Sequence, residues 1–219
     1  MRLLKLLFGL LLGLPATHAF AQTGRDWRTT VTPTGSGAWV IGNPAAKVKL
    51  VEYLSYTCPH CGAFVTESKP VLFDQWVRSG SVSVEVRHAI RDGLDFSAAL
   101  LARCTGPRNF ASVHTAIFAN QKALLEKGVS VTPPANASRE AALKAIADGS
   151  GLTAIVSPRL TRSVDACLSD AAERDRLVAM TRAAFDKIKG TPAFELNGEL
   201  IQGTDWAGME PRLRAAGAR

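Results

Sequence analysis

Apolar and polar residues alternate in two short stretches in the first half of the chain. Residues 48–54 are rich in β-branched and apolar side chains, and residues 81–89 place valine at every second position, so both stretches predict strands. Between them, residues 58–77 follow a helical spacing, with Pro70 expected to kink or restart the helix and Gly80 to end it. The order is strand, helix, strand, for which a parallel pair of strands is the usual geometry.

Helical periodicity dominates the second half. Residues 96–187 are rich in alanine and predict four or five helices, separated by breaks that contain proline. Residues 193–202 predict a β-hairpin that turns at Asn197-Gly198, and residues 208–216 predict a closing helix. Because strands are expected on both sides of the helical block, the predicted fold class is α/β, with the helices inserted into the domain that holds the sheet.

These patterns divide the chain into parts with different roles. A stretch rich in Thr, Gly and Pro near the N-terminus has no apolar period, so we expect regular structure to begin only near Trp39. The predicted parts are a signal peptide (1–21), a flexible N-terminal arm (22–37), a discontinuous α/β domain (38–94 and 188–219) and a helical insertion (95–187).

The first residues have the three regions of a secretory signal. Basic Arg2 and Lys5 precede an apolar stretch over residues 6–14, and Ala19-Phe20-Ala21 offers a small-residue site, with cleavage predicted after Ala21. The apolar stretch is shorter than the ~20 residues that span a bilayer. We therefore expect a protein exported to an oxidising, extracytoplasmic space.

The charge pattern argues against one class of partner. The formal net charge is +7 at pH 7, and over residues 159–176 basic and acidic side chains are interspersed, as on a solvated helix surface. Nucleic-acid binding is typically accompanied by a basic patch or stripe, so no nucleic-acid partner is expected.

The motif Cys58-Pro59-His60-Cys61 lies directly between the first strand and the first helix. Two cysteines at this spacing can close a disulfide ring, and the unpaired N–H groups of a helix N-terminus favour an anionic sulfur on the first of them. His60 can add positive charge or a hydrogen-bond donor near the Cys58 sulfur. A stabilised thiolate makes the disulfide easy to reduce, so the pair is predicted to pass its disulfide to other thiols.

The order of elements around this motif resembles the thioredoxin fold. The run from Val51 to Cys61, together with Gly190-Thr191-Pro192-Ala193-Phe194 and Asn197-Gly198, is similar to the DsbA family of periplasmic thiol oxidoreductases. The resemblance implies a thioredoxin-like fold with a helical insertion between the second strand and the C-terminal hairpin. It also implies a periplasmic location.

The same resemblance implies roles for single residues. Cys58 would be the exposed nucleophile and Cys61 the buried resolving thiol, with Pro59 and His60 tuning the pair. Thr191-Pro192 matches a cis-proline beside the active site, whose backbone pairs with an extended substrate, although an ordinary proline that begins a strand is the alternative. Glu52 matches a buried acidic residue that relays protons for Cys61; the alternative is a glutamate on an edge strand that faces water.

The implied activity is donation of the Cys58–Cys61 disulfide to reduced, folding secreted proteins through a mixed disulfide at Cys58. Reoxidation would come from a membrane quinone reductase of the DsbB type, and the chain is expected to be a monomer. Alternatives are a disulfide isomerase, with which the threonine at 191 agrees, a reductant for cytochrome assembly, or a non-catalytic binding module that resembles a chaperone. No cofactor and no metal are predicted, since Cys58, Cys61 and two histidines lack metal-site spacing.

Two cysteines and two histidines outside the motif are also candidates for a chemical or structural role. Cys104 and Cys167 each fall within an apolar helical pattern, and in an oxidising compartment they are predicted to form a structural disulfide; two buried free thiols are the alternative. His88 and His114 are interpreted as structural histidines with satisfied hydrogen bonds.

Overall fold

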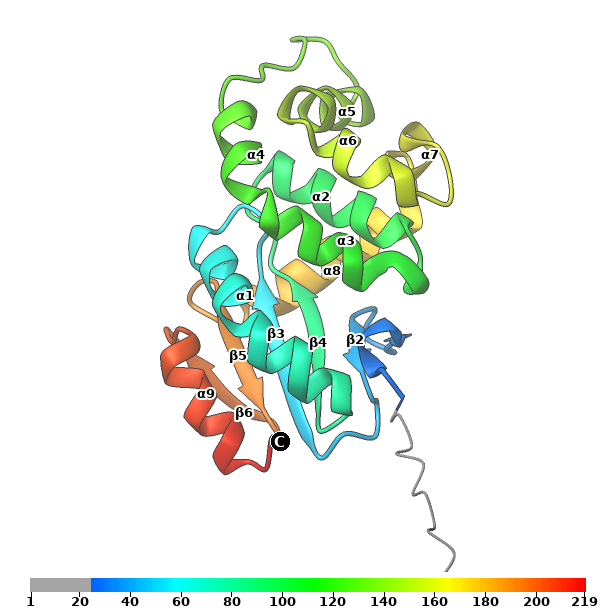
Figure 1. Cartoon of the computed structure of the whole chain (residues 1–219). Helices are drawn as coiled ribbons and strands as arrows, with labels where there is room; N and C mark the ends of the chain where they lie inside the picture. Colours follow the sequence, from blue (N-terminus) through cyan, green and yellow to red (C-terminus); the bar gives the residue numbers. More distant parts are fainter. Residues whose placement is uncertain (1–24) are drawn as a thin grey trace, which may run out of the picture.

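The computed structural model describes residues 25–219, which contain a six-stranded mixed sheet (Figure 1). The strand order is β1-β2-β4-β3-β5-β6, and β3 and β4 are parallel while every other neighbouring pair is antiparallel. The strands are β1 (Val31–Pro33), β2 (Trp39–Gly42), β3 (Val48–Leu54), β4 (Val82–His88), β5 (Ala193–Leu196) and β6 (Glu199–Gln202). The predicted parallel pair and the C-terminal hairpin are therefore confirmed.

Side chains of β3 alternate between two apolar cores, as the period of a strand requires. Leu50 and Leu54 face the larger core, together with the valines of β4. Val51 and Tyr53 face a smaller core that contains Ala184. Because both faces of β3 are covered, this strand lies in the middle of the domain and ends where the Cys58 motif begins.

Helices cover both faces of the sheet (Figure 1). One face carries α1 (Pro59–Val71), its π-helical continuation η2 (Leu72–Val77) and α9 (Trp206–Ala215), and the other face carries α8 (Ala171–Phe185). Pro70 lies at the last turn of α1, directly before the π-helical segment, as expected for a residue that cannot continue the hydrogen-bond ladder. Gly80, at φ 82°, follows this helical unit.

The insertion holds more helices than the periodicity predicted. Seven α-helices lie between β4 and β5 where four or five were expected, and several are only five to eight residues long. Breaks at Gly106-Pro107 and at Gly151, whose φ is 85°, divide what reads as longer helical runs. Besides α8 they are α2 (Gly93–Cys104), α3 (Pro107–Ala119), α4 (Gln121–Gly128), α5 (Arg139–Ser150), α6 (Leu152–Val156) and α7 (Val164–Leu168), with a 3₁₀ turn η3 (Ser157–Arg159).

The prediction that regular structure begins near Trp39 is wrong. A 3₁₀ turn, η1 (Trp27–Thr29), is followed by β1, which pairs with β2 and extends the sheet. Arg28 binds Asp74 of η2, with 2.7 Å between Nη1 and Oδ1. The arm predicted for residues 22–37 therefore carries an edge strand over its described part. The predicted signal peptide and residues 22–24 lie outside the described residues.

Cys104, at the end of α2, and Cys167, in α7, form a disulfide with a Cα–Cα distance of 5.7 Å. The bond joins two helices of the insertion whose cysteines are 63 positions apart. None of the helices in residues 25–219 is both long and apolar enough to cross a membrane.

Candidate active site

Cys58 is the N-cap residue of α1, as its place after the first strand predicted. Its backbone is extended, with φ −86° and ψ 115°, and Pro59 occupies the first helical position, where a missing N–H costs nothing. The carbonyl oxygen of Cys58 accepts the first helical hydrogen bond, from the N–H of Gly62 at 3.1 Å. The Cys58 sulfur is thereby held beside the positive end of the helix.

Several donors surround the Cys58 sulfur and lower the pKa of its thiol to about 4. The largest contribution is a hydrogen bond from the Cys61 thiol, and the Thr191 side chain and the N–H groups of Cys61 and His60 add to it, against the opposing effect of burial. His60 thus acts through its backbone, while its exposed ring makes no hydrogen bond to any described residue. At neutral pH the reduced site holds a Cys58 thiolate.

Cys61 lies inside the domain with no exposed surface, and both cysteines are free thiols, so the structure represents the dithiol form. Burial, followed by the neighbouring Cys58 sulfur, raises the pKa of the Cys61 thiol strongly. The prediction of an exposed Cys58 needs correction, because this residue is only 3% exposed. Thr191 lies against its sulfur, and the cavity beside it is also lined by Arg91 and Phe185.

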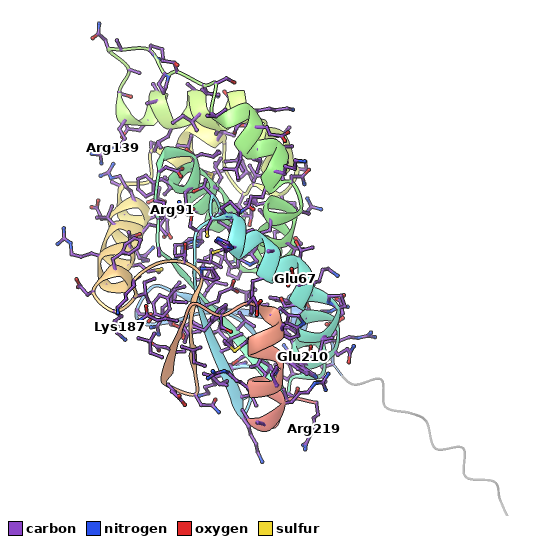
Figure 2. All side chains as sticks on the ribbon, turned by 90° about the vertical axis from the view of Figure 1, so that its left-hand side faces the viewer. Glu67, Arg91, Arg139, Lys187, Glu210 and Arg219 are labelled. Atoms are coloured by element: carbon purple, nitrogen blue, oxygen red, sulfur yellow. A yellow bond between two sulfur atoms is a disulfide. The ribbon has the colours of Figure 1, made fainter. Side chains whose placement is uncertain are left out.

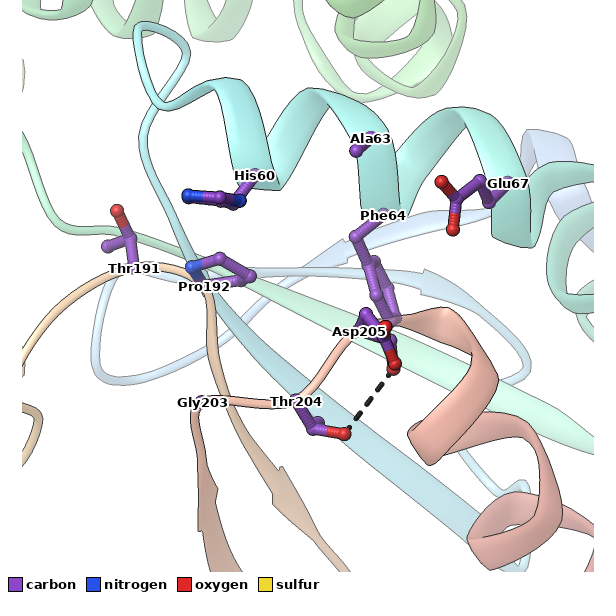
Figure 3. A pocket seen from close by; sticks show the side chains of 9 residues that line it. All are labelled: His60, Ala63, Phe64, Glu67, Thr191, Pro192, Gly203, Thr204 and Asp205. Carbon is purple, nitrogen blue, oxygen red and sulfur yellow. Dashed lines mark hydrogen bonds between the residues drawn. The ribbon is translucent and has the colours of Figure 1, made fainter.

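The Thr191–Pro192 peptide bond is cis, and the Cys58 sulfur lies 3.2 Å from the carbonyl oxygen of Thr191. Two cavities meet at this point. One, of about 560 Å³, has a polar wall that includes Glu67 and Asp205, with Pro192 and His60 at one end (Figure 3). The other, of about 430 Å³, is lined by Cys58, Pro59, His60, Arg91, Phe185 and Thr191. The cis-proline loop therefore lies against the Cys58 sulfur, and only the second of the two cavities is lined by Cys58 itself.

Glu52 lies on β3, in the middle of the sheet, and is completely buried. Neither of its carboxylate oxygens has a hydrogen-bond partner among the described residues. Burial raises the pKa of this carboxyl to about 8, and its charge in turn raises the pKa of Cys61. Glu52 is therefore protonated at neutral pH and close enough to Cys61 to interact with it electrostatically, which excludes the alternative of an edge-strand glutamate facing water.

The sequence did not reveal that the helical insertion holds the loop before Cys58. Tyr56 donates its backbone N–H to Asp95 of α2 at 2.8 Å, and its hydroxyl lies 3.0 Å from Nδ1 of His114 in α3. Gln121, the first residue of α4, donates from Nε2 to the carbonyl oxygens of Tyr56 and Cys58, each at 2.9 Å. Asp92, the N-cap of α2, also holds this loop by accepting from the Thr57 hydroxyl at 2.6 Å. An aspartate before a helical run is a pattern that could have marked Asp92, but nothing in the sequence marks Gln121.

The prediction that the rings of His88 and His114 have hydrogen-bond partners holds only in part. His114 pairs with the Tyr56 hydroxyl through Nδ1, whereas Nε2 of His114 and both ring nitrogens of His88 have no partner among the described residues. Burial lowers the pKa of both histidines, so both rings are neutral. No group of three or more His, Cys, Asp or Glu side chains arranged to hold a metal is found in residues 25–219.

Comparison with known proteins agrees with this geometry. The thioredoxin family model matches residues 34–213. A Rickettsia bellii protein, provisionally named a protein-disulfide oxidoreductase, is 32% identical over 73% of this chain and 56% of its own length. The chain spans little more than half the length of this relative and of the similar one from Rickettsia typhi, of which it covers 54%.

Solved structures extend the likeness to nearly whole chains. The crystal structure of a protein-disulfide isomerase from Novosphingobium aromaticivorans is 35% identical, with a TM-score of 0.73 over 80% of this chain and 95% of the other. Wolbachia pipientis α-DsbA1, at 20% identity, shares the fold with a TM-score of 0.66 over 84% of this chain and 92% of its own. The chain belongs to the thioredoxin family, in the DsbA-like form in which a helical domain interrupts the thioredoxin fold.

Proposed function

We propose that this protein is a thiol:disulfide oxidoreductase that donates the Cys58–Cys61 disulfide to reduced secreted proteins. The observation that carries the proposal is the contrast between the two sulfurs. Cys58 has a pKa of about 4 at the helix N-terminus, whereas the pKa of buried Cys61 is raised. Stabilising the thiolate stabilises the reduced site, and this makes the oxidised site a good disulfide donor.

The reaction begins with attack of a client thiolate on the Cys58 sulfur. A bond forms between the client sulfur and Cys58, the Cys58–Cys61 bond breaks, and its electron pair leaves with Cys61. The thiolate released at Cys61 is buried and needs a proton. Glu52, protonated below its pKa of about 8 and interacting with Cys61, is the donor that we assign, directly or through water.

The second step releases the client. A second client thiolate attacks the client sulfur of the mixed disulfide, forms the client disulfide and expels Cys58 as a thiolate. Cys58 is a good leaving group because its pKa is about 4. Thr191 and Pro192, beside the sulfur, would align an extended client backbone. The enzyme has gained two electrons, and a membrane quinone reductase of the DsbB type would remove them.

Location and assembly belong to the same proposal. An oxidase of this kind needs an oxidising compartment, which agrees with a signal peptide over residues 1–21 and a periplasmic location. We propose a monomer, since the expected role requires access to Cys58 from solvent and no second copy.

Disulfide isomerisation is the second candidate, because the 35% identical structure is of a protein named a disulfide isomerase. An isomerase acts from the dithiol state, whereas a donor must be held oxidised. The redox state in which the pair is held separates a donor from an isomerase, and the reduction potential separates a donor from a dedicated reductant. We would equilibrate the protein with glutathione buffers and map Cys58 and Cys61 by alkylation and mass spectrometry. A potential well above about −270 mV, towards −120 mV, supports the donor; a value near or below −270 mV rejects it.

A further inference from the structure

A third cavity, of about 330 Å³, lies beside the active site between the end of β4 and helix α8. Its apolar wall comes from Ile90, Phe96 and Val178. Its polar groups already have partners inside the protein. The Thr181 hydroxyl accepts from the N–H of Ile90 at 3.2 Å, and the Asp92 carboxylate accepts from the Thr57 hydroxyl at 2.6 Å. What the cavity offers a ligand is therefore mainly apolar surface.

Arg91 joins this apolar cavity to the cavity that contains Cys58, because it lines both. Its side chain is exposed on the face that also carries α8 (Figure 2), and its guanidinium forms no hydrogen bond or ion pair with any described residue. A guanidinium in this position can bind backbone carbonyl groups of a passing chain. The two cavities therefore adjoin at Arg91, and together they lead away from the reactive sulfur.

Helix α8 adds exposed apolar side chains along the same path. Phe185 lines the Cys58 cavity and Val178 lines the apolar one, and each is 45% exposed. Only Val129 and Leu200 are further large apolar side chains with comparable exposure in the described part of the chain, and neither lines these cavities. Half of this exposed set therefore lies on the path from the nucleophile.

We infer that this path, named here the α8 groove and defined by Arg91, Phe185, Ile90, Phe96 and Val178, binds an apolar side chain of the client a few residues from its reactive cysteine. The inference rests on the proposed function and names the client segment that it prefers. The occupant is a client chain because its cysteine must enter the Cys58 cavity, which adjoins the groove at Arg91. The polar cavity with Glu67 and Asp205 on the other side gives an apolar side chain less favourable surroundings.

The helix sets the spacing. Seven residues separate Phe185 from Val178, which is about 10 Å along an α-helix. An extended chain covers this length in about three residues. The preferred client therefore carries a leucine, isoleucine or phenylalanine about three to four residues from the cysteine that attacks Cys58.

The test mixes the oxidised protein with an excess of peptides that each contain one cysteine. Two peptides reduce one Cys58–Cys61 bond and become joined by a disulfide. Peptide pairs differ only in leucine or serine three residues before or after the cysteine, and glutathione is the thiol without a side chain for the groove. We expect one leucine peptide to react about tenfold faster than its serine partner, since burial of a leucine is worth at least that factor. Val178→Asp should remove this preference and leave the glutathione rate unchanged.

Val129→Asp is the matched control, with the same chemical change at a site that is 87% exposed and outside the groove. It should keep the preference. Val178→Ala, which favours the helix, should reduce the preference without any risk to folding. An equal preference in Val178→Asp and Val129→Asp, or none in the parent protein, overturns the groove. The groove is also overturned if sedimentation shows that the parent protein is a dimer and that Val178→Asp dissociates it. The α8 groove would then be a contact between two copies.

The proposed function can fail separately. If neither glutathione nor any peptide reduces the Cys58–Cys61 bond, disulfide donation is rejected. The groove is then tested by binding of labelled peptides with serine in place of cysteine. Tighter binding of the leucine peptide, lost in Val178→Asp, supports the groove, and equal binding of both peptides rejects it.

Discussion

Gln121 donates a hydrogen bond from its side-chain amide to the carbonyl oxygen of Cys58, with 2.9 Å between Nε2 and the oxygen. A residue of the helical insertion thus holds the N-cap of the helix at whose start the Cys58 sulfur lies. The same amide also binds the carbonyl oxygen of Tyr56, and its Oε1 lies too close to Gly62 for that residue to carry a Cβ. Glycine at 62 is therefore what lets the insertion approach the active-site helix so closely.

Replacing Gln121 should change both the free energy of unfolding and the pKa of Cys58. Gln121→Leu leaves the Tyr56 carbonyl without a partner, and we expect the free energy of unfolding to fall by about 1–3 kcal/mol. Because the Cys58 sulfur is aligned with its donors by the N-cap backbone, the pKa of Cys58 should rise above 4. Thiolate absorbance at 240 nm measures this pKa. Lys122→Leu, on the same helix with a side chain that is 91% exposed, is the control, and an identical pKa in the two variants would disprove a positioning role for Gln121.

The Cys58 thiolate should persist in acid. The rate of alkylation of the reduced protein should be constant above about pH 5 and should fall with a midpoint near pH 4. The folded pKa is below the unfolded value, so the resulting stabilisation of the reduced form is complete above the unfolded pKa of about 8.5 and is lost as pH falls through 4. Cys61→Ala removes the largest cause and should raise the midpoint. A midpoint near 8 in the parent protein would contradict the site described above.

Glu52 should make the reduced protein less stable as pH rises. Its folded pKa of about 8 exceeds the unfolded value of 4.5, so the folded state holds the proton longer and loses stability between these two pH values. Glu52→Gln should be the more stable protein at pH 8, by on the order of 4 kcal/mol, and nearly equal to the parent at pH 4. Urea unfolding at both pH values measures the difference.

The glutamine variant should also slow the chemistry. A glutamine cannot transfer a proton to or from Cys61, so the rate of client oxidation should fall while the pKa of Cys58 changes little. A variant that is more stable yet equally fast would remove Glu52 from the proton path.

The disulfide between Cys104 and Cys167 should contribute stability without taking part in exchange. Its partners are 63 positions apart, and closing a loop of this length lowers the entropy of the unfolded chain by an amount worth about 4 kcal/mol. The double variant Cys104→Ala with Cys167→Ala should lose up to this amount in urea unfolding. Its active-site potential should match that of the parent, and a shifted potential would instead couple this bond to the active site.

Local patterns predicted the parts of the fold that depend on neighbouring residues. Strand alternation gave β3 and β4, Asn197-Gly198 gave the hairpin, and the position of Cys58 after a strand gave its N-cap role. A three-residue edge strand such as β1 has too few positions to show a period, so it was missed. The predicted number of helices in the insertion was too low. Breaks at glycine and before short helices leave the apolar spacing almost unchanged, so the periodicity does not reveal them.

The surroundings of the nucleophile depend on distant residues and could not be predicted. Asp95 and Gln121 bind Tyr56 across 39 and 65 positions, and the loop at Thr191 that covers Cys58 is 133 positions away. Cys58 is consequently far less exposed than its role as a nucleophile suggested. Glu52 could be picked out as an anomalous carboxylate, but its complete burial follows from the central place of β3.

The same separation of 133 positions between Cys58 and Thr191 has a consequence for biogenesis. A chain that is synthesised or exported from its N-terminus presents Cys58, Cys61 and the complete disulfide-bonded insertion before β5 is available. During that interval the two reactive thiols lack the cis-proline loop that shields them. Until the last thirty or so residues arrive, Cys58 and Cys61 are therefore open to mispairing with other thiols.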